Sequence, residues 1–531
     1  MGDKIQILIA MIAYMLIVIG IGVYFAKRSN KNAENYFLGG RSLGPWVAAM
    51  SAEASDMSGW LLMGLPGVAY WCGLADAAWT AIGLAIGTYV NWLIVSKRLR
   101  GYSVVAGNAI TLPDFFSNRF KEKKKVILGI SSLFILVFFA VYASSCFVTC
   151  GKLFAGLFDT DYHLMLIIGA IFVLIYTIIG GFLAESASDF MQSIVMLVAL
   201  LGVVIFGINE AGGVGAVLEN AKGIDGFLSL TELASPAVDE AGNQLFNGST
   251  PLFGEAQPYS ILTICSMLAW GLGYFGMPQV LLRFMAIRKS SELKRSRRIA
   301  IVWVVISLAT AVFIGFVGCA VILKHPELAA SLGTKSLAEN VFAVLGEILF
   351  HPVVAGVIMA GILAATISSS DSYLLIAGSA VSQGLYKGIF KKNATDKQVM
   401  WMSRIVLLVI TLVGIVIAWD DESIIFNIVS FAWAGFGATF GPLMLFSLFW
   451  KRTTRAGAVA GMLSGGAMVF IWKFCLNPMG GVWAIYELLP AFIVSSIVIV
   501  AVSLATAKPS AEIEEEFEMA KNYKDPEQVN A

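Results

Sequence analysis

Charged residues are scarce in this chain. Asp, Glu, Lys and Arg make up 13% of its 531 residues, whereas hydrophobic residues make up 58%. The mean hydropathy is +0.81, well outside the range of an ordinary soluble domain. The formal net charge of +1 gives no basic excess that would imply nucleic acid as a partner. We therefore predict a protein that resides in the lipid bilayer and binds no nucleic acid.

Histidine and cysteine are also rare. None of the three His residues has a second His or Cys at the spacing of zinc ligands; they are His163, His325 and His351. The six Cys residues fall in or beside apolar segments and include no Cys-x-x-Cys pair. A zinc enzyme and a His-based catalytic triad therefore have no basis in this sequence, and we predict that the chain is not an enzyme.

The N-terminal region lacks the features of a cleavable signal peptide. Residues 5–26 form an apolar segment that is too long for a signal-peptide core, and no small-residue cleavage site follows it. We expect this segment to be retained as a membrane helix.

Long apolar runs, by contrast, are abundant. A helix that crosses about 30 Å of hydrocarbon needs about 20 apolar residues. Thirteen runs of this length begin near Ile5, Leu43, Ala75, Val126, His163, Asp189, Pro258, Ile299, Pro352, Ser403, Ser423, Ala456 and Ala484. We therefore predict an all-α membrane protein with 13 transmembrane helices.

Lys and Arg are concentrated in alternate loops between these runs. The basic loops are residues 27–41, 97–125, 288–298, 387–397 and 451–455, whereas the intervening loops are acidic or nearly uncharged. Cytoplasmic loops carry the excess of Lys and Arg, so the basic loops are expected inside. With 13 spans, the N-terminus then lies outside and the C-terminus lies in the cytoplasm.

Two of the runs contain clusters of helix-breaking residues. The second run reads SDMSGW at residues 55–60 and GLPG at 64–67, and the seventh reads WGLGYFGMP at 270–278. Close packing is the alternative explanation for either cluster alone. Interrupted segments at corresponding positions of two halves indicate inverted repeats whose breaks meet near the midplane. We therefore predict a five-plus-five repeat of helices 2–6 and 7–11.

This interpretation divides the chain into six segments. They are a first helix with its cytoplasmic loop (1–42), a first five-helix repeat (43–210), an extracellular loop (211–257), a second five-helix repeat (258–450), two additional helices (451–507) and a cytoplasmic tail (508–531). The first helix and the last two would be additions to the repeats.

Acidic residues in the second run are candidates for a functional site. A carboxylate near the bilayer centre costs about 2.5 to 3.5 kcal/mol, so Asp56 must face a cavity, a cation or a partner. Glu53 lies one turn earlier, and pairing with a basic residue such as Arg41 is favoured over ion binding. We expect Asp56 and the carbonyls released at the break to face the ninth run.

The ninth run supplies hydroxyl groups at a similar depth. Every residue in 366–372 (TISSSDS) except Ile367 carries a hydroxyl or an acid. Ser368 and Ser369, together with carbonyls near Asp56, would supply the oxygen ligands that a hard cation such as Na⁺ prefers. Hydrogen bonding to the carbonyl four residues earlier is the alternative for any single hydroxyl.

Aromatic residues flank both breaks. Trp60, Trp270 and Tyr274 could clamp the apolar body of a small solute. The N–H groups near Ser58 and Gly59 would suit a carboxylate, as a helix N-terminus does. The two breaks and the ninth run therefore predict a midplane site for a cation and a small solute.

Several motifs together resemble the sodium:solute symporter family, over residues 5–510. They are YFLGGRSLGPW (36–46), ASDMSGWLLMGLPG (54–67), WGLGYFG (270–276), AWAGFG (432–437) and FGP (440–442). The resemblance implies a LeuT-type fold and secondary active symport by alternating access, in a bacterial cytoplasmic (inner) membrane. The chain closely resembles the members of the family that take up L-proline with Na⁺.

The resemblance also implies roles for individual residues. Na⁺ would be held by carbonyls of Ala54, Met57 and Ala365 and by hydroxyls of Ser368 and Ser369. Proline would contact Ser58, Gly59, Trp60, Tyr142, Trp270, Tyr274 and Pro278. Coupling would involve Asp56, Asp189 and Arg41.

Three alternatives remain open on the sequence alone. The solute could be pantothenate, a sugar or a short carboxylate carried by the same fold. The pair Ser370-Asp371 resembles other branches of the family, which leaves Li⁺ or H⁺ open as the coupled ion. A transporter-like sensor is less favoured, because the tail after residue 508 has no room for a signalling module.

Overall fold

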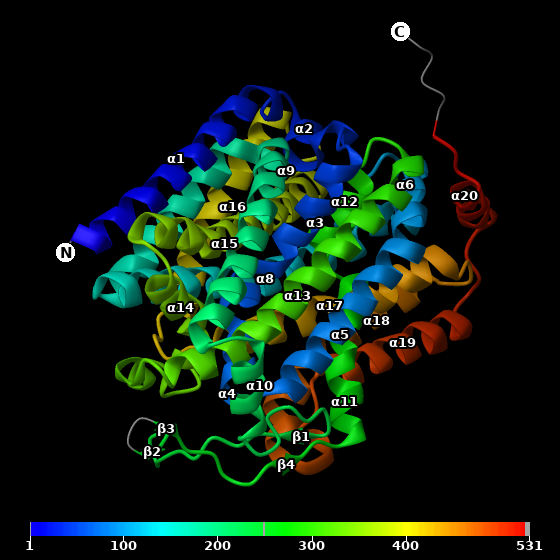
Figure 1. Ribbon diagram of the computed structural model, residues 1–531. Coiled ribbons are helices and arrows are strands. Elements are labelled where there is room, and N and C mark those ends of the chain that lie inside the picture. The colour runs from blue at the N-terminus through cyan, green and yellow to red at the C-terminus, as the bar shows by residue number, and fades with distance from the viewer. Residues whose placement is uncertain (1, 248–249, 526–531) are drawn as a thin grey trace.

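The structure is a computed structural model that describes residues 2–247 and 250–525. Its helices pack side by side as a bundle (Figure 1). The first half forms α1 (Gly2–Ser29), α2 (Ala33–Leu38), η1 (Gly39–Arg41), α3 (Pro45–Gly59), η2 (Trp60–Gly64), α4 (Leu65–Cys72), α5 (Leu74–Val90), η3 (Asn91–Val95), α6 (Ser96–Val105), α7 (Leu112–Arg119), α8 (Val126–Phe158), α9 (Tyr162–Ala211) and α10 (Val214–Lys222).

The second half is also mainly helical. It forms α11 (Ile261–Leu268), η4 (Ala269–Phe275), α12 (Pro278–Ala286), η5 (Ser290–Glu292), α13 (Leu293–Ile322), η6 (Pro326–Leu332), η7 (Leu337–Asn340), α14 (Val341–Leu349), α15 (Pro352–Ser379), η8 (Ala380–Phe390), α16 (Asp396–Ile417), α17 (Ile425–Phe449), α18 (Arg455–Ile471), η9 (Trp472–Leu476), η10 (Asn477–Met479), η11 (Gly481–Trp483), α19 (Leu488–Ala505) and α20 (Ala511–Lys521).

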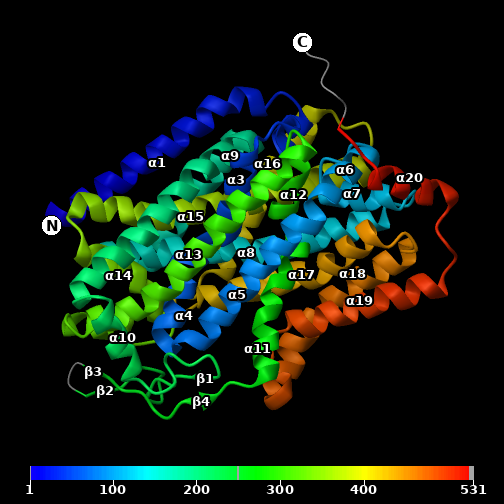
Figure 2. The same cartoon turned by 45° about the vertical axis from the view of Figure 1, so that its right-hand side comes forward.

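The few strands all lie in the connection between α10 and α11. They are β1 (Glu232–Leu233), β2 (Phe246–Asn247), β3 (Thr250–Pro251) and β4 (Gln257–Pro258). β1 pairs antiparallel with β4, and β2 pairs antiparallel with β3. This connection covers one end of the bundle, whereas α2, α6 and α20 lie at the other end (Figure 2).

Both predicted helix breaks are confirmed. Ser58 has φ 47 and ψ −171, which interrupts α3, and the π-helical η2 follows. In the seventh run, 3-10 turns over η4 precede α12, and the two parts are bent by 41°. α12 begins at Pro278. Proline has no backbone N–H, but the first residue of a helix donates no intrahelical hydrogen bond, so none is lost.

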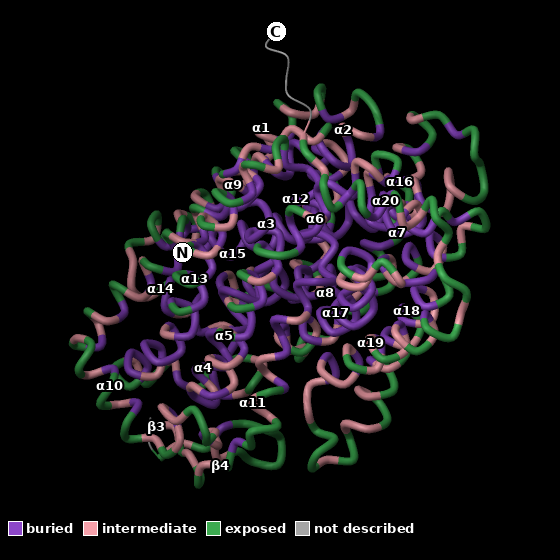
Figure 3. The backbone as a smooth tube through the Cα atoms, turned by 90° about the vertical axis from the view of Figure 1, so that its right-hand side faces the viewer, coloured by how far each residue is buried: buried purple, intermediate pink, exposed green. Residues whose placement is uncertain are grey.

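The broken α3 and the hydroxyl-bearing α15 are enclosed by protein. Every residue from 48 to 70 and from 358 to 380 is buried. Figure 3 shows this buried backbone (purple) at the centre of the bundle, with exposed segments around it. Backbone that is irregular at membrane depth is therefore shielded from lipid, as it must be.

Length and hydropathy identify fewer spans than the predicted 13. Among the described residues, 10 helices are long and apolar enough to cross a membrane, or 11 if the bent pair of α11–η4 and α12 counts as one. The broken α3 and α4 fall short of this length separately. α9 counts once although it has 50 residues, or about 75 Å of straight helix.

α9 folds back on itself at Gly181. This glycine has φ 65 and ψ 178, which is outside the helical region. The Tyr176 hydroxyl lies 2.6 Å from Ser188 Oγ, although 12 residues of continuous helix would separate them by about 18 Å. The sixth run predicted from the sequence begins near Asp189, eight residues after this reversal.

The two ends of the chain pack against different regions. Lys4 pairs with Asp159 at the turn between α8 and α9. α20 packs on α6, where the Arg98 guanidinium lies 4.8 Å from the centre of the Phe517 ring. The tail is therefore not simply a polar extension, and the part of it in residues 526–531 lies outside the described residues.

Candidate functional site

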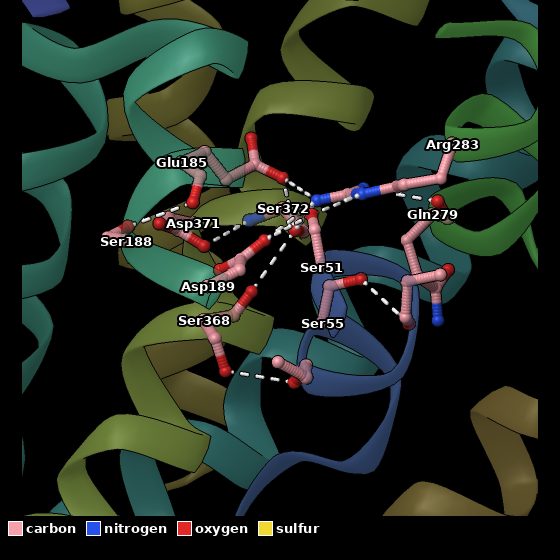
Figure 4. Close-up of polar contacts among 12 residues, drawn as sticks. Ser51, Ser55, Glu185, Ser188, Asp189, Gln279, Arg283, Ser368, Asp371 and Ser372 are labelled. Carbon is pink, nitrogen blue, oxygen red and sulfur yellow. Dashed lines mark hydrogen bonds and ion pairs between the residues drawn. The ribbon is translucent and has the colours of Figure 1, made fainter. Parts of the chain in front are cut away.

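Two helices meet at the predicted cation site. The hydroxyls of Ser368 and Ser369 on α15 both donate to the Ala54 carbonyl on α3, at 2.9 and 3.2 Å. Ser368 Oγ also lies 3.2 Å from the Ala365 carbonyl. Four of the five predicted ligands therefore converge beside the break in α3, and Figure 4 shows Ser368 pointing toward that helix.

The fifth predicted ligand has a different partner. The Met57 carbonyl accepts the backbone N–H of Trp60 across the break. It lies in the same turn as the Ala54 carbonyl but is not an acceptor for either serine hydroxyl.

Other hydroxyls in residues 366–372 bond to the carbonyl four residues earlier in their own helix, which was the alternative explanation. Thr366 Oγ1 donates to the carbonyl of Ile362 at 2.7 Å, and Ser370 Oγ donates to the carbonyl of Thr366. These two side chains satisfy their own helix. Ser368 and Ser369 are different because they reach across to the break, which supplies neutral oxygens suited to a hard monovalent cation.

The Asp56 carboxylate does not face the serine pair, which corrects that expectation. Asp56 is 3% exposed, and its Oδ1 accepts from Gln279 Nε2 at 3.1 Å. Gln279 is the second residue of α12, so the contact joins the two broken helices. The Tyr142 hydroxyl donates to the Asp56 carbonyl at 3.2 Å. Asp56 is two residues from Ala54, so helical periodicity places the two residues on different faces of α3.

The expected pairing of Glu53 with Arg41 is wrong. Glu53 is fully buried, and its Oε1 accepts from Trp92 Nε1 at 3.0 Å. Arg41 instead donates to the carbonyls of Met285 and Ala109, at 2.7 and 2.8 Å. The side chains lie on different elements because α3 carries Glu53 into the bundle, while Arg41 stays in η1 before it.

Arg41 links the segment at the end of α6 to the end of α12. In addition to the two carbonyls, it donates to Ser103 Oγ at 3.0 Å and to Asn108 Oδ1 at 3.1 Å. Burial, with a smaller effect of the nearby Arg100, lowers the pKa of Arg41 to about 10. The guanidinium is therefore still cationic at neutral pH and bridges the α6 region to the end of α12.

The aromatic residues at the two breaks stack on each other. The Trp60 and Trp270 rings are 5.6 Å apart between centres and nearly parallel, at 29°. The Phe426 ring centre lies 5.3 Å from that of Trp270, and the Tyr486 ring centre lies 5.1 Å from that of Trp270. The two breaks therefore lie side by side, as expected, and Phe426 and Tyr486 are neighbours that the sequence analysis missed.

Trp433 is another missed neighbour. Its Nε1 donates to the Trp270 carbonyl at 2.8 Å, and its ring meets that of Tyr274 edge-on at 5.0 Å. A Cβ at Gly273 would lie 2.0 Å from Trp433 Nε1, so only glycine allows this approach. The AWAGFG motif at 432–437 was the available signal, since small residues in a span favour close packing.

Gly59 and Pro278 lie at the two breaks, because α3 ends at Gly59 and α12 begins at Pro278. A Cβ at Gly59 would lie 2.4 Å from Thr149 Oγ1, so this glycine lets α8 approach the break closely. The Ser58 hydroxyl accepts the backbone N–H of Trp60 at 3.2 Å. Ser58 and Gly59 thus stand at the end of α3, where the run is interrupted.

Several buried polar atoms near the breaks have no hydrogen-bond partner among the described residues. They include Trp60 Nε1, the Tyr274 hydroxyl and Gln279 Oε1. Leaving such a group unpaired costs about 1 to 3 kcal/mol. Unsatisfied donors beside apolar rings are typical of a site that binds a polar small molecule.

A buried cluster of charges adjoins the cation site. Arg283 on α12 is 0% exposed and pairs with Glu185 and with Asp189, the latter at 3.2 Å. Its guanidinium also contacts Ser372 Oγ at 2.9 Å and Ser51 Oγ at 3.0 Å. This cluster joins α3, α9, α12 and α15 (Figure 4).

The charges in this cluster do not balance. Asp371 lies beside Glu185 and Asp189 in Figure 4, and one of its oxygens accepts the N–H of Ser372 at 2.7 Å. Three carboxylates therefore face one guanidinium, and each carboxylate has one oxygen without a partner among the described residues. Asp189 was among the predicted site residues, whereas Arg283 and Glu185 were missed, although ionisable residues inside membrane runs are functional candidates by default.

The chain has close relatives among known proteins. Residues 36–465 match the model of the sodium:solute symporter family. A sodium/proline symporter of Staphylococcus aureus strain USA300 / TCH1516 is 42% identical over 515 residues, which covers 96% of this chain and 94% of that protein. The sodium/proline symporter of strain MSSA476 matches with the same identity and coverage.

Solved structures share the fold. A Na⁺-coupled sialic acid symporter, in a substrate-bound outward-open state, matches with a TM-score of 0.74 at 18% identity, over 95% of this chain and 99% of that one. The nucleobase-cation-symport-1 family transporter Mhp1 matches with a TM-score of 0.54 at 13% identity, over 93% and 100% of the two chains. The fold is thus LeuT-type, and the chain belongs to the sodium:solute symporter family.

Proposed function

We propose that this chain takes up L-proline together with Na⁺ by alternating access. The observation that carries the proposal is the convergence of the Ser368 and Ser369 hydroxyls on the Ala54 carbonyl, at the end of a broken helix. The 42% identity to a sodium/proline symporter supports proline as the solute. The membrane would be the bacterial cytoplasmic membrane.

The proposed topology has 13 spans, with the N-terminus outside. Among the described residues, length and hydropathy identify 11 spans when the bent pair counts as one. α9 adds a span when it counts as two spans that reverse at Gly181, and α3 with α4 adds another as one broken span. The α20 end of the bundle carries the basic loops and would face the cytoplasm. The segment boundaries predicted from the sequence stand as part of this proposal.

Na⁺ would bind between α3 and α15. Carbonyls of Ala54, Met57 and Ala365 and hydroxyls of Ser368 and Ser369 would surround it. The Ala54 and Ala365 carbonyls already lie within 3.2 Å of a serine oxygen. The Met57 carbonyl would turn from the Trp60 N–H toward the ion. These neutral ligands hold a cation without a permanent charge, so the ion can leave again.

Proline would lie beside the two breaks. Its carboxylate would accept N–H groups near Ser58 and Gly59, while its ring would contact Trp60 and Trp270. The unpaired Trp60 Nε1 and Tyr274 hydroxyl offer further donors for the carboxylate. Tyr142 and Pro278 complete the proposed contacts, since Tyr142 already reaches the Asp56 carbonyl.

Coupling requires that both ligands favour the same conformation. Asp56 joins α3 to α12 through Gln279, two residues from Ala54 in the sequence. Asp189 accepts from Ser51 Oγ at 2.7 Å, which connects α9 to the same helix. Na⁺ binding would therefore position the broken helices around the solute, and Arg41 would hold the cytoplasmic ends together.

The energetics are sufficient with a single ion. One Na⁺ moving across about 100 mV releases about 2.3 kcal/mol, which supports roughly fifty-fold accumulation of the solute. A Na⁺ concentration gradient adds to this value.

Uptake into proteoliposomes tests the proposal. With Na⁺ outside and an inside-negative potential, labelled proline should accumulate, and choline in place of Na⁺ should abolish accumulation. Unchanged uptake in choline would refute Na⁺ coupling. A competition panel of proline, pantothenate, a sugar and a short carboxylate tests the solute, and displacement by one of the others instead of proline would correct it.

A further inference from the structure

A basic cavity, which none of the proposed transport-site residues line, lies where α6 approaches the start of α13. Its volume is about 770 Å³, within the range that holds a drug-sized ligand. Its lining includes seven cationic side chains, Lys97, Arg100, Arg288, Lys289, Lys294, Arg297 and Lys524, and one carboxylate, Asp525. Arg288 is paired with the neighbouring Glu292, at 2.8 Å. The remaining positive charge is not neutralised by the lining.

The cavity contains two buried donors that lack partners among the described residues. Arg100 is 5% exposed, and its Nε donates to the Ile287 carbonyl at 2.8 Å. Its Nη1 is buried without a hydrogen bond, and so is the Ser290 hydroxyl. Unpaired buried donors of this kind call for an acceptor, and a guanidinium beside a hydroxyl suits a phosphate oxygen.

The chain itself places an anionic oxygen at this position. Asp525 Oδ2 accepts the Ser290 N–H at 2.6 Å, and Asp525 Oδ1 lies 3.6 Å from Arg100 Nη2. The inner end of the cavity is thus compatible with a negatively charged oxygen. One carboxylate leaves Arg100 Nη1 and the Ser290 hydroxyl unsatisfied, so a further acceptor fits there.

The surroundings of the cavity resemble a membrane interface. Trp46 is 49% exposed and Tyr89 is 45% exposed. The Arg295 guanidinium lies 6.0 Å from the Trp46 ring, and the Arg297 guanidinium lies 5.6 Å from the Tyr89 ring. Exposed aromatic and basic residues together mark the level of lipid headgroups. Leu93, which lines the cavity, is 45% exposed and gives the cavity an exposed apolar wall.

We propose that this cavity binds the phosphate of an anionic phospholipid from the adjacent leaflet. Arg100 and Ser290 contact the phosphate at the inner end, and Lys97, Lys289 and Lys294 surround the mouth. The acyl chains run past Leu93. A soluble phosphate shares this chemistry, but the exposed apolar wall favours a lipid. The inference does not depend on which solute the chain transports.

Lipid binding to the purified full chain tests the proposal. Native mass spectrometry in detergent, with equal amounts of phosphatidylglycerol and phosphatidylcholine, should show phosphatidylglycerol bound at least about tenfold better. Glycerol phosphate at millimolar concentration should not displace it. Equal binding of the two lipids would overturn the proposal. Displacement by glycerol phosphate would also overturn it, because the ligand would then be a soluble anion.

Matched charge variants separate this cavity from the general basic character of that face. Lys97→Gln, Lys289→Gln and Lys294→Gln together should lower phosphatidylglycerol binding at least about tenfold. The control removes three exposed lysines that do not line the cavity, Lys123→Gln, Lys124→Gln and Lys392→Gln, and should bind within about twofold of wild type. An equal loss in both triple variants would overturn the proposed site.

A single substitution addresses the inner end. Arg100→Gln should also lower binding at least about tenfold, because it removes the buried charge. Arg100 also holds the Ile287 carbonyl, so thermal unfolding is measured alongside. If Arg100→Gln does not fold, the comparison of the two triple lysine variants decides whether the lipid binds in this cavity.

Discussion

Two polar regions of α15 lie one turn apart and differ in kind. Ser368 and Ser369 donate to the Ala54 carbonyl and form no hydrogen bond with a charged side chain in the described part of the chain. Ser372, one turn further, joins a cluster of one guanidinium and three carboxylates. Neutral oxygens can bind and release a monovalent ion, whereas buried ion pairs are strongly destabilised when one partner is removed. The first region therefore suits an ion that comes and goes, and the second suits a connection between helices.

Breaking the charged cluster should have the largest effect on stability. Arg283→Gln leaves Glu185, Asp189 and Asp371 without their buried cation, and such a loss costs about 3 to 5 kcal/mol. We expect a large fall in the thermal unfolding midpoint of the purified protein. Arg298→Gln, at an exposed position in α13, is the control and should unfold like wild type.

A second substitution checks that charge imbalance is the cause. Adding Glu185→Gln to Arg283→Gln removes one of the uncompensated carboxylates, so the double variant should be more stable than Arg283→Gln alone. If Arg283→Gln unfolds at the wild-type temperature, the cluster does not hold these helices together.

Asp56 connects α3 to α12 through Gln279 and should affect coupling more than stability. Asp56→Asn keeps an acceptor for Gln279 Nε2 but removes the charge. We expect Na⁺ to stimulate proline binding at least about tenfold less in this variant than in wild type, because a hydrogen bond to a charged group is lost. Binding is measured with labelled proline at several Na⁺ concentrations. Wild-type stimulation in this variant would remove Asp56 from the coupling mechanism.

The smallest effect is expected at Ser370. Its hydroxyl donates to the Thr366 carbonyl within α15 and does not reach the break. Ser370→Ala should leave both stability and Na⁺ affinity close to wild type, within about 1 kcal/mol. Thermal unfolding and a Na⁺ titration check this, and a large loss of Na⁺ affinity would show that the ion site extends further along α15.

Much of the site could be predicted because polar and helix-breaking residues are costly in lipid. The glycines at 271–276, the break at Ser58 and the hydroxyls of residues 366–372 each required a reason, and the structure brings them together. The residues that were missed lie within apolar runs, where composition hides them. Arg283 is an example, because it is surrounded by residues such as Leu282 and Phe284.

Side-chain direction and chain reversal were harder to predict. Helical periodicity places Asp56 near the break but does not show that its partner is Gln279, which is 223 residues away in sequence. The length of the apolar sequence predicted two spans in this region, but it did not mark Gly181 as the point of reversal, since glycine is common in membrane helices. The docking of α20 on α6 likewise depends on contacts between distant segments.

A Na⁺ titration of proline binding to the Ser368→Ala and Ser369→Ala variants tests the central claim most directly. Each variant loses one oxygen ligand, so the Na⁺ concentration for half-maximal binding should rise about tenfold or more, with the unfolding midpoint near that of wild type. Ser370→Ala serves as the matched control. A wild-type Na⁺ dependence in both variants would contradict the assignment of the cation site to α3 and α15.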